Sequence, residues 1–291
     1  MGIRLCEYIF LTIDKIYENF TLNNSDIMLI CLKFGVIFVE NKKRLRDNRI
    51  LLNLYQIYKF IVIFPCVGVS TIALALPAAL LLFVFGPKTA QICGKIWSRF
   101  NGFMTPMLVS VVGMENVDRK QSYVIVANHL SLYDIFAVYG WFPVDIRWVM
   151  KIELRKIPIM GYMAEKMGHI CIDRSNSRAA INTINAAKNR ITGGTSAFFF
   201  PEGTRSETET MLPFKKGAFR LAVDMGLPIL PLTIVGTNYV LPTNTISLFP
   251  GRVKIIAHKP IDIKGYNYET LEKLMNDARI AIESGFTGEF S

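Results

Sequence analysis

The sequence has few of the side chains that hold metal ions or form disulfide frameworks. Its three histidines are scattered, and its five cysteines form no CxxC pair and no cluster with histidine. A multi-histidine metal site is therefore not expected. The cysteines lie in or near apolar segments, which predicts buried free thiols in a reducing compartment. They are Cys6, Cys31, Cys66, Cys93 and Cys171.

Charged residues are also scarce. They make up 19% of the 291 residues while hydrophobic residues make up 51%, against about 25% charged residues in a typical soluble domain. This balance predicts that part of the surface lies in lipid. The formal net charge of +10 suits anionic partners such as phospholipid headgroups, phosphate-bearing cosubstrates or acidic proteins. Nucleic-acid binding would depend on net charge alone, so we do not expect it.

One long segment lacks charge altogether. Residues 60–86 contain no charged side chain and would form a helix about 40 Å long, against a hydrocarbon core of about 30 Å. Pro65 and Pro77 predict a kink in that helix. The helix could span the membrane once, or it could dip in and return through residues 87–113. Basic residues flank both ends and do not choose between the two arrangements. We favour the hairpin, which keeps both flanks on one side.

The pattern after Val117 is that of an α/β fold, a mixed sheet flanked by helices. We therefore predict a helical extension over 1–56, a membrane-embedded helical segment over 57–113 and a catalytic domain over 114–291. The predicted strands are 123–127, 146–150, 170–172, 197–200, 229–235 and 253–257. The predicted helices are 132–139, 153–166, 178–191, 216–224 and 268–284.

A histidine and an aspartate follow the first predicted strand. Residues five apart do not share a face of a regular helix. His129 and Asp134 can therefore meet only if His129 lies in the turn before a helix and Asp134 lies in its first turns. The carboxylate would then orient the imidazole and leave its other nitrogen as a base. The alternative is a capping Asn128 beside an ordinary histidine.

A second candidate site follows another apolar strand, where residues 197–205 read AFFFPEGTR. The planar fork of Arg205 suits a phosphate, Gly203 permits a close backbone approach, and Glu202 needs a partner if it is buried. Arg174 ends a further strand-like run and could be a second phosphate ligand. Each of these motifs alone could equally be a solvated turn or a surface charge.

Four short blocks follow one another in a fixed order. They read NHxxxxD at 128–134, GxxxIDR at 168–174, FPEGTR at 200–205 and LPILP at 227–231. In order and spacing they resemble the glycerolipid acyltransferases of the 1-acyl-glycerol-3-phosphate acyltransferase type, over about residues 100–265. The resemblance implies a fold like that of glycerol-3-phosphate acyltransferase. His169 departs from the family, which often has a small or aliphatic residue there, and we take His169 and His258 as structural or surface residues.

The resemblance also implies roles for the individual residues. His129 would be the general base and Asp134 would orient it. The acceptor's phosphate would be bound by residues of the second and third blocks, namely Arg174, Glu202, Gly203, Thr204 and Arg205. The fourth block, around Pro231, is linked to the acyl donor, and Lys215 and Lys216 either bind that donor or are solvated. No metal and no bound cofactor is implied, because the donor, acyl-CoA or acyl carrier protein, is a cosubstrate.

These observations together predict a membrane-bound enzyme of phospholipid biosynthesis. It would move a fatty acyl group from acyl-CoA or acyl carrier protein to the free hydroxyl of lysophosphatidic acid, which gives phosphatidic acid. Both donors are cytosolic, so we expect the domain on the cytoplasmic face, of the inner membrane if the source is bacterial. The alternatives are another lysophospholipid or an aminolipid as acceptor, a non-catalytic lipid-binding protein, or a thioester or lipid hydrolase. A hydrolase would need a nucleophile, and the sequence has no G-x-S-x-G elbow.

Overall fold

A computed structural model describes residues 49–208 and 210–286. Most of the predicted extension over 1–56, including Cys6 and Cys31, lies outside the described residues. Of the three described cysteines, Cys93 is buried, and Cys66 and Cys171 are half-buried. The expectation of buried thiols is therefore confirmed for Cys93 and holds in part for the other two.

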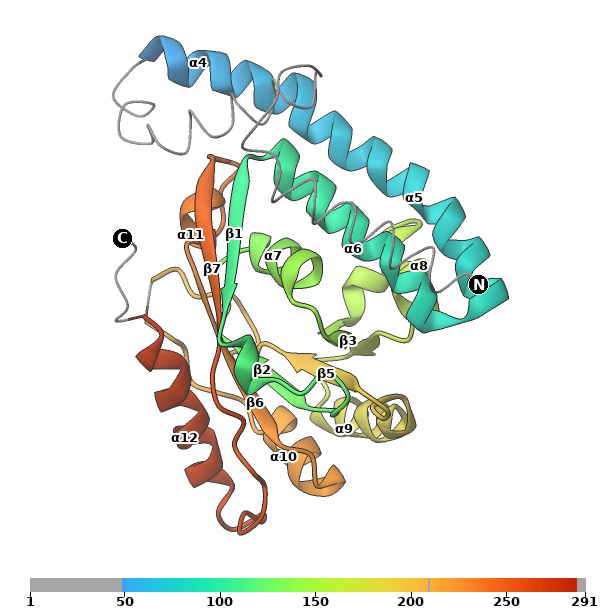
Figure 1. The fold of residues 1–291 in the computed structure, drawn as a ribbon, viewed down its shortest axis with the longest axis vertical. Helices are drawn as coiled ribbons and strands as arrows, with labels where there is room; N and C mark the ends of the chain where they lie inside the picture. The colour runs from blue at the N-terminus through green and yellow to red at the C-terminus, as the bar shows by residue number, and fades with distance from the viewer. Residues whose placement is uncertain (1–48, 209, 287–291) are drawn as a thin grey trace.

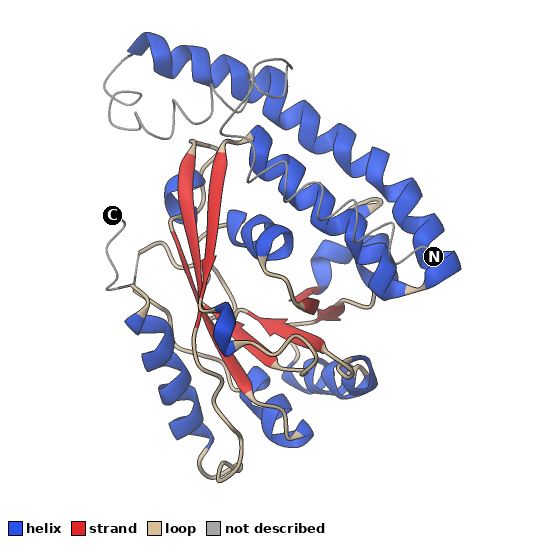
Figure 2. Cartoon of the chain, in the orientation of Figure 1, coloured by secondary structure: helices blue, strands red, loops and turns tan. Residues whose placement is uncertain are grey.

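The core of the molecule is a seven-stranded mixed sheet with the order β1-β7-β6-β2-β5-β3-β4. Only the β6–β7 pair is antiparallel, and every other neighbouring pair is parallel. Figure 2 shows the strands running through the middle of the molecule with helices on both faces. The strands are β1 (Met107–Val112), β2 (Val124–Ala127), β3 (Asp145–Lys151), β4 (Ile170–Ile172), β5 (Thr195–Phe199), β6 (Ile229–Val235) and β7 (Gly251–Ala257). The predicted fold class is confirmed.

Successive side chains of the central strands point to opposite faces of the sheet and contribute to two separate apolar cores. Ile125 of β2 and Phe198 of β5 face one core, which α7 (Tyr133–Trp141) covers. Val124 and Phe199 face the other core, beneath α9 (Ser177–Ala186), α10 (Gly217–Met225) and α12 (Leu271–Ser284). β2 and β5 are buried along their whole length, which is typical of parallel strands covered on both faces. Figure 1 shows these helices on opposite sides of the sheet.

The predicted helix over 153–166 is wrong as a single element. The structure has a 3₁₀ turn η3 (Ile152–Lys156) followed by a short α8 (Met160–Lys166). Pro158 explains the break, because proline offers no backbone N–H and disfavours helical geometry in the residue before it. The predicted helix over 178–191 also ends early and continues as η4 (Lys188–Arg190). The chain also has two short elements that we did not predict, η2 (Met114–Asn116) and α11 (Thr237–Val240).

The apolar segment forms the first arm of a helical hairpin. A continuous helix runs through α4 (Arg49–Tyr58), a π-helical turn η1 (Lys59–Ile63) and α5 (Phe64–Phe85). It ends at Gly86, whose φ of 83° favours glycine. The chain then returns as α6 (Pro87–Met104), which lies beside α5 in Figure 1. Pro65 lies at the start of α5, just after the π-helical turn, and Pro77 lies inside it.

Polar contacts join the two arms of this hairpin. The Ser70 hydroxyl and the Asn101 side chain hydrogen bond to each other at 3.1–3.3 Å. Trp97 Nε1 donates to Thr71 Oγ1 at 3.0 Å. Within the described residues, the stretch Leu52–Phe85 is the one helix long and apolar enough to cross a membrane, by length and composition.

A strand occupies part of the segment that we predicted to be helical over 57–113. Residues 107–112 form β1, which pairs in parallel register with β7 from Met107–Gly251 to Val112–Ile256. Its sequence, MLVSVV, is short and rich in β-branched side chains, which suits a strand. The sheet therefore begins before residue 114, and the division into three domains stays a prediction.

Candidate active site

The candidate site lies at one edge of the sheet. His129 follows the end of β2, Glu202 follows β5, and Arg174 follows β4. β4, β3, β5 and β2 are successive parallel neighbours, so their carboxyl ends meet at the same edge. In open α/β sheets, ligands bind outside the carboxyl ends of the strands. Residues far apart in the sequence are therefore gathered where a substrate can reach them.

The structure brings His129 and Asp134 into direct contact. His129 lies in the turn before α7, and Asp134 is the second residue of that helix. His129 Nδ1 lies 2.7 Å from Asp134 Oδ2. The Asp134 side chain is completely buried, whereas 13% of the His129 side chain is exposed. The imidazole is thus held from its Nδ1 side and has some access to solvent, as a base requires.

Backbone groups fix the position of Asp134. Its Oδ2 also accepts hydrogen bonds from the N–H groups of Leu130 and Ser131, at 2.8 and 2.9 Å. Its Oδ1 is buried and has no hydrogen-bond partner among the described residues. Asn128 is not a helix cap, because its side chain hydrogen bonds to the N–H and C=O of Ile234 in β6, both at 2.8 Å. These bonds tie the histidine turn to the neighbouring strand.

An aromatic ring that we did not single out from the sequence lies on His129. The Phe200 ring stacks on the imidazole, with centroids 3.8 Å apart and planes 10° apart. Phe200 itself stacks against Trp148 of β3 at 5.9 Å. Stacking fixes the plane of the imidazole, while Asp134 fixes its rotation. The sequence signal for Phe200 was its place at the end of an apolar strand, which did not distinguish it from a core residue.

Glu202 accepts a hydrogen bond from the backbone of the turn that contains His129. It is 3% exposed, and its two oxygens accept separate backbone hydrogen bonds of 2.8 Å from the N–H groups of His129 and Leu212. Burial raises the pKa of this carboxyl, while the two backbone hydrogen bonds oppose that rise. Glu202 thus ties the backbone at His129 to that at Leu212, and its predicted role in binding the acceptor stays a prediction.

Two cationic side chains meet the turn at Gly203. Arg174 donates from Nη1 to the Gly203 carbonyl, and burial lowers its pKa. Gly203 has a φ of 77°, which favours glycine. Lys215 lies on the other side of the same turn: a Cβ atom at position 203 would be 2.8 Å from its Nζ. The second and third blocks are thus brought together as the resemblance implied.

The remaining predicted site residues are placed less tightly. Arg205 is half-buried and Thr204 is exposed. Lys216 forms an ion pair with Glu272 of α12, at 2.5 Å. Pro231 is buried inside β6, opposite Val126 of β2, so its side chain is part of the sheet core. The roles predicted for these residues stay predictions.

The other two histidines have structural contacts. His169 is 6% exposed and accepts a hydrogen bond from the Trp148 N–H through Nδ1, at 3.2 Å. Burial, together with the nearby Arg147, lowers the pKa of His169 to about 3. His258 Nε2 lies 2.8 Å from Thr233 Oγ1. His169 is therefore a neutral residue that extends the β3–β4 pairing, away from the candidate site.

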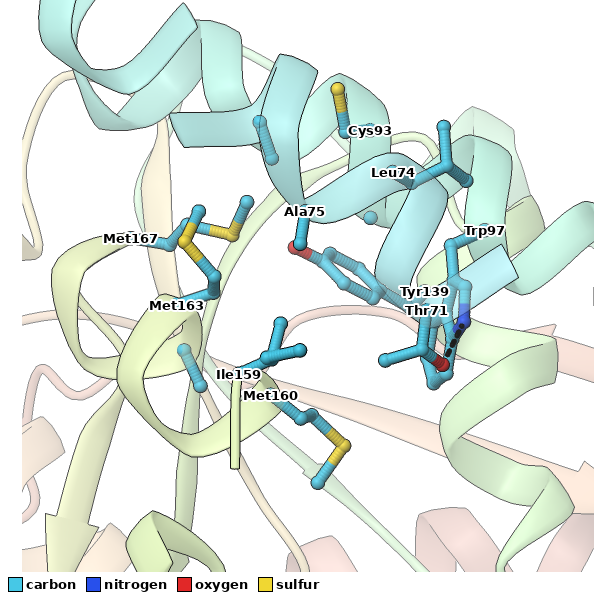
Figure 3. A pocket seen from close by; sticks show the side chains of 13 residues that line it. Thr71, Leu74, Ala75, Cys93, Trp97, Tyr139, Ile159, Met160, Met163 and Met167 are labelled. Carbon is cyan, nitrogen blue, oxygen red and sulfur yellow. Dashed lines mark hydrogen bonds between the residues drawn. The ribbon is translucent and has the colours of Figure 1, made fainter. Parts of the chain in front are cut away.

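An apolar pocket lies between the hairpin and the helices α7 and α8. It has a volume of about 110 Å³ and is lined by side chains of α5, α6, α7 and α8. Figure 3 shows Tyr139 in its centre, Met163 of α8 and Met167 just after that helix on one side, and Trp97 of α6 on the other. Tyr139 contacts Trp148 edge to face at 6.1 Å. Aromatic rings therefore connect this pocket, through Trp148 and Phe200, to His129.

Comparison with known proteins identifies the class of this fold and site. Residues 108–235 match the family model described as Acyltransferase. The crystal structure of the 1-acyl-sn-glycerophosphate acyltransferase PlsC from Thermotoga maritima superposes with a TM-score of 0.61 at 26% identity. That likeness covers 77% of this chain and 99% of the other. The protein is thus an α/β acyltransferase by fold.

Sequence relatives narrow the assignment. An enzyme from Limnanthes alba named 1-acyl-sn-glycerol-3-phosphate acyltransferase is 30% identical over 236 residues, which are 78% of this chain and 83% of that protein. The chloroplastic enzyme of that name from Brassica napus is 32% identical over 67% of this chain. The one from Saccharomyces cerevisiae is 41% identical over 45% of this chain. The chain belongs to the 1-acyl-sn-glycerol-3-phosphate acyltransferase family. It spans 54–58% of the length of the chloroplastic and algal relatives.

Proposed function

We propose that the protein transfers a fatty acyl group to the free hydroxyl of lysophosphatidic acid and forms phosphatidic acid. The observation that carries the proposal is the His129–Asp134 contact of 2.7 Å beside the Arg174–Gly203 contact, at one edge of the sheet. One contact supplies a base and the other a cation for a phosphate. A glycerol backbone places a hydroxyl and a phosphate within a few bonds of each other, so both groups could be held at once.

The geometry around His129 suggests how the transfer proceeds. With Nδ1 held by Asp134, Nε2 takes the proton from the acceptor hydroxyl while that oxygen attacks the thioester carbonyl. The carbon–sulfur bond then breaks, and the imidazolium returns the proton to the leaving thiolate. The negative charge of Asp134 stabilises the imidazolium between these steps. Because one residue serves as base and then as acid, no acyl-enzyme is needed.

The serines of the site support transfer rather than hydrolysis through a serine nucleophile. Ser131 Oγ donates to the Leu241 carbonyl at 2.7 Å and accepts from the Tyr133 N–H at 3.1 Å. Ser206 Oγ donates to the Thr210 carbonyl at 2.8 Å. Both hydroxyls are committed to backbone groups, so neither is poised for attack.

The contacts of the hairpin support a membrane-bound enzyme whose apolar helix does not span the bilayer. Lys59, just before the charge-free run, donates to the Ile246 carbonyl at 3.1 Å. Lys88, just after it, donates to the Gly193 carbonyl at 2.9 Å. Both ends of the run therefore contact the catalytic domain, whereas a spanning helix would separate its ends by a core of about 30 Å. The outward side chains of α5, such as Leu76 and Phe83, are 78% and 90% exposed, which suits contact with lipid.

Labelling would test this disposition. In a protein without native cysteines, Asn53→Cys on α4 and Asn182→Cys on α9 are a matched pair of exposed helical positions. We expect an impermeant maleimide to label both sites from the same side of sealed vesicles. Labelling of the two sites from opposite sides would mean that α5 spans the membrane.

The apolar pocket suits an acyl chain. Its walls come from α5 and α8 and are almost wholly apolar, and its central Tyr139 is linked by aromatic contacts to the ring stacked on His129. An acyl chain in this pocket would lie on the hairpin side of the aromatic rings that pack against His129. The donor, acyl-CoA or acyl carrier protein, would approach from the cytosol.

The experiment that tests the function is transfer by membranes that contain the wild type or His129→Ala, with lysophosphatidic acid and labelled acyl-CoA. We expect phosphatidic acid from the wild type, and a rate about 10²–10⁴-fold lower from the variant. Acyl carrier protein and other lysolipids would be tried next. Release of free fatty acid without transfer would instead support a hydrolase.

A further inference from the structure

Lys215 occupies a different place from the one that its sequence position suggested. Its backbone N–H donates to the Pro201 carbonyl at 2.8 Å, which ties the segment before α10 to the turn of the third block. Its side chain then lies over Gly203, because a Cβ atom there would be 2.8 Å from both Nζ and Cε of the lysine. Lys215 therefore belongs spatially to the Gly203 turn.

Three cations are associated with this turn, and none of them has a carboxylate partner. Arg174 is bonded to the Gly203 carbonyl, Lys215 lies against Gly203, and Arg205 follows two residues later. Among the residues that the structure describes, no carboxylate lies within ion-pair distance of any of the three. Glu202, the carboxylate beside Gly203 in this turn, uses both oxygens on backbone N–H groups. Glu153 acts on Arg174 through space without forming an ion pair with it. A half-buried turn with three cations that lack ion-pair partners suits an anion.

The neighbouring lysine provides an internal contrast. Both lysines are exposed, but Lys216 is paired with Glu272, at 2.5 Å. Its charge is therefore neutralised within the protein, whereas that of Lys215 is not. Two adjacent residues of the same type thus differ in the property that matters for anion binding.

We propose that Lys215 binds the phosphate of the acceptor and that, with Arg174 and Arg205, it makes the site selective for a phosphomonoester dianion over a phosphodiester monoanion. This inference rests on the proposed function and replaces the predicted role of Lys215 in binding the acyl donor. A phosphomonoester has three free oxygens and a charge close to −2 at pH 7. A phosphodiester, such as a headgroup-substituted lysolipid, has two free oxygens and a charge of −1. A third cation is useful only to the first of these.

The test compares Lys215→Met with Lys216→Met in the full-length protein. KM is measured for lysophosphatidic acid and for lysophosphatidylglycerol at a fixed concentration of acyl-CoA, and for acyl-CoA at a fixed concentration of lysophosphatidic acid. We expect Lys215→Met to raise KM for lysophosphatidic acid about 10- to 100-fold, because a hydrogen bond between charged groups is lost. The KM values for acyl-CoA and for lysophosphatidylglycerol should change by less than about threefold. Lys216→Met should leave the preference between the two acceptors unchanged. Lys215→Arg should retain most of the preference that Lys215→Met loses.

The pH profile adds a readout that a merely structural role would not move. Below about pH 6 the phosphomonoester takes up a proton and becomes a monoanion. The ratio of KM between Lys215→Met and the wild type should therefore shrink from pH 7.5 to pH 5. A ratio that does not vary with pH would contradict selection of the dianion.

Binding in the His129→Ala background separates this inference from the proposed function. Affinity for lysophosphatidic acid is measured there without turnover, with and without Lys215→Met. If the wild type transfers no acyl group but Lys215→Met still weakens binding, the function fails and the phosphate site stands. If Lys215→Met behaves like Lys216→Met, or raises KM for acyl-CoA instead, the assignment of Lys215 is wrong.

Discussion

The hairpin and the candidate-site edge of the sheet differ in how many of their buried polar side chains have hydrogen-bond partners. At the sheet edge, Asn128 and Glu202 are buried and use their side-chain polar atoms on backbone partners. In α6, Gln91 and Ser98 are just as buried, yet their side chains have no hydrogen-bond partner among the described residues. The first region fixes side chains in exact directions, as catalysis requires. In the second region, Ser70 and Asn101 hydrogen bond to each other across the two arms, whereas Gln91 and Ser98 are surrounded without such a bond among the described residues.

The largest effect that would test this contrast is expected at Asp134. The change Asp134→Asn keeps the shape of the side chain but removes the negative charge that balances an imidazolium on His129, 2.7 Å away. We expect kcat to fall by about 10²–10⁴-fold, while circular dichroism and membrane association stay unchanged. The measurement is single-turnover transfer to lysophosphatidic acid. A loss of less than about threefold would show that Asp134 only stabilises the turn.

A smaller effect, on stability, is expected at Glu202. In Glu202→Gln the amide NH₂ would face one of the two backbone N–H groups that the carboxylate now accepts. Unfolding free energy should fall by about 1–3 kcal/mol, as measured by denaturation in detergent. Burial raises the pKa of Glu202 in the folded state, so its contribution to stability is present at low pH and is lost as pH rises through that raised pKa. The unfolding free energies of the wild type and of Glu202→Gln should therefore become more similar as pH rises above about 4.3, the pKa of an unperturbed glutamate.

The matched change in the hairpin should not lower the unfolding free energy, in contrast to Glu202→Gln. Gln91→Leu removes a buried amide that has no hydrogen-bond partner among the described residues. We expect it to leave stability unchanged or raise it by up to about 2 kcal/mol, in the same denaturation experiment. A loss comparable to that of Glu202→Gln would mean that both regions depend on polar contacts, and the contrast would fail.

The sequence predicted the elements around the site well, because its signals are local. Six of the predicted strands correspond to strands of the structure, since apolar runs between turns are visible along the chain. Helix geometry set the condition under which His129 and Asp134 could meet, and the resemblance implied that they do; the required turn-plus-helix arrangement is present. β1 was missed because its six residues directly follow a long helix and show little alternation of apolar and polar side chains.

Contacts that depend on packing could not be read from the sequence. The stacking of Phe200 on His129 and the bonds of Glu202 to two distant N–H groups arise only when β2 and β5 lie side by side. Likewise, the difference between Lys215 and Lys216 depends on which one reaches Glu272 of α12. A one-dimensional pattern gives these two lysines the same environment.

The pairing of β1 with β7 has a consequence for the order of folding. β1 directly follows the hairpin, yet its partner lies about half a chain further on, with Met107 opposite Gly251. During synthesis from the N-terminus the hairpin emerges long before the sheet can close over β1. Until then β1 offers unpaired backbone groups to any neighbouring chain. Early insertion of the hairpin into lipid would anchor the growing chain and keep the still unpaired β1 away from other nascent chains.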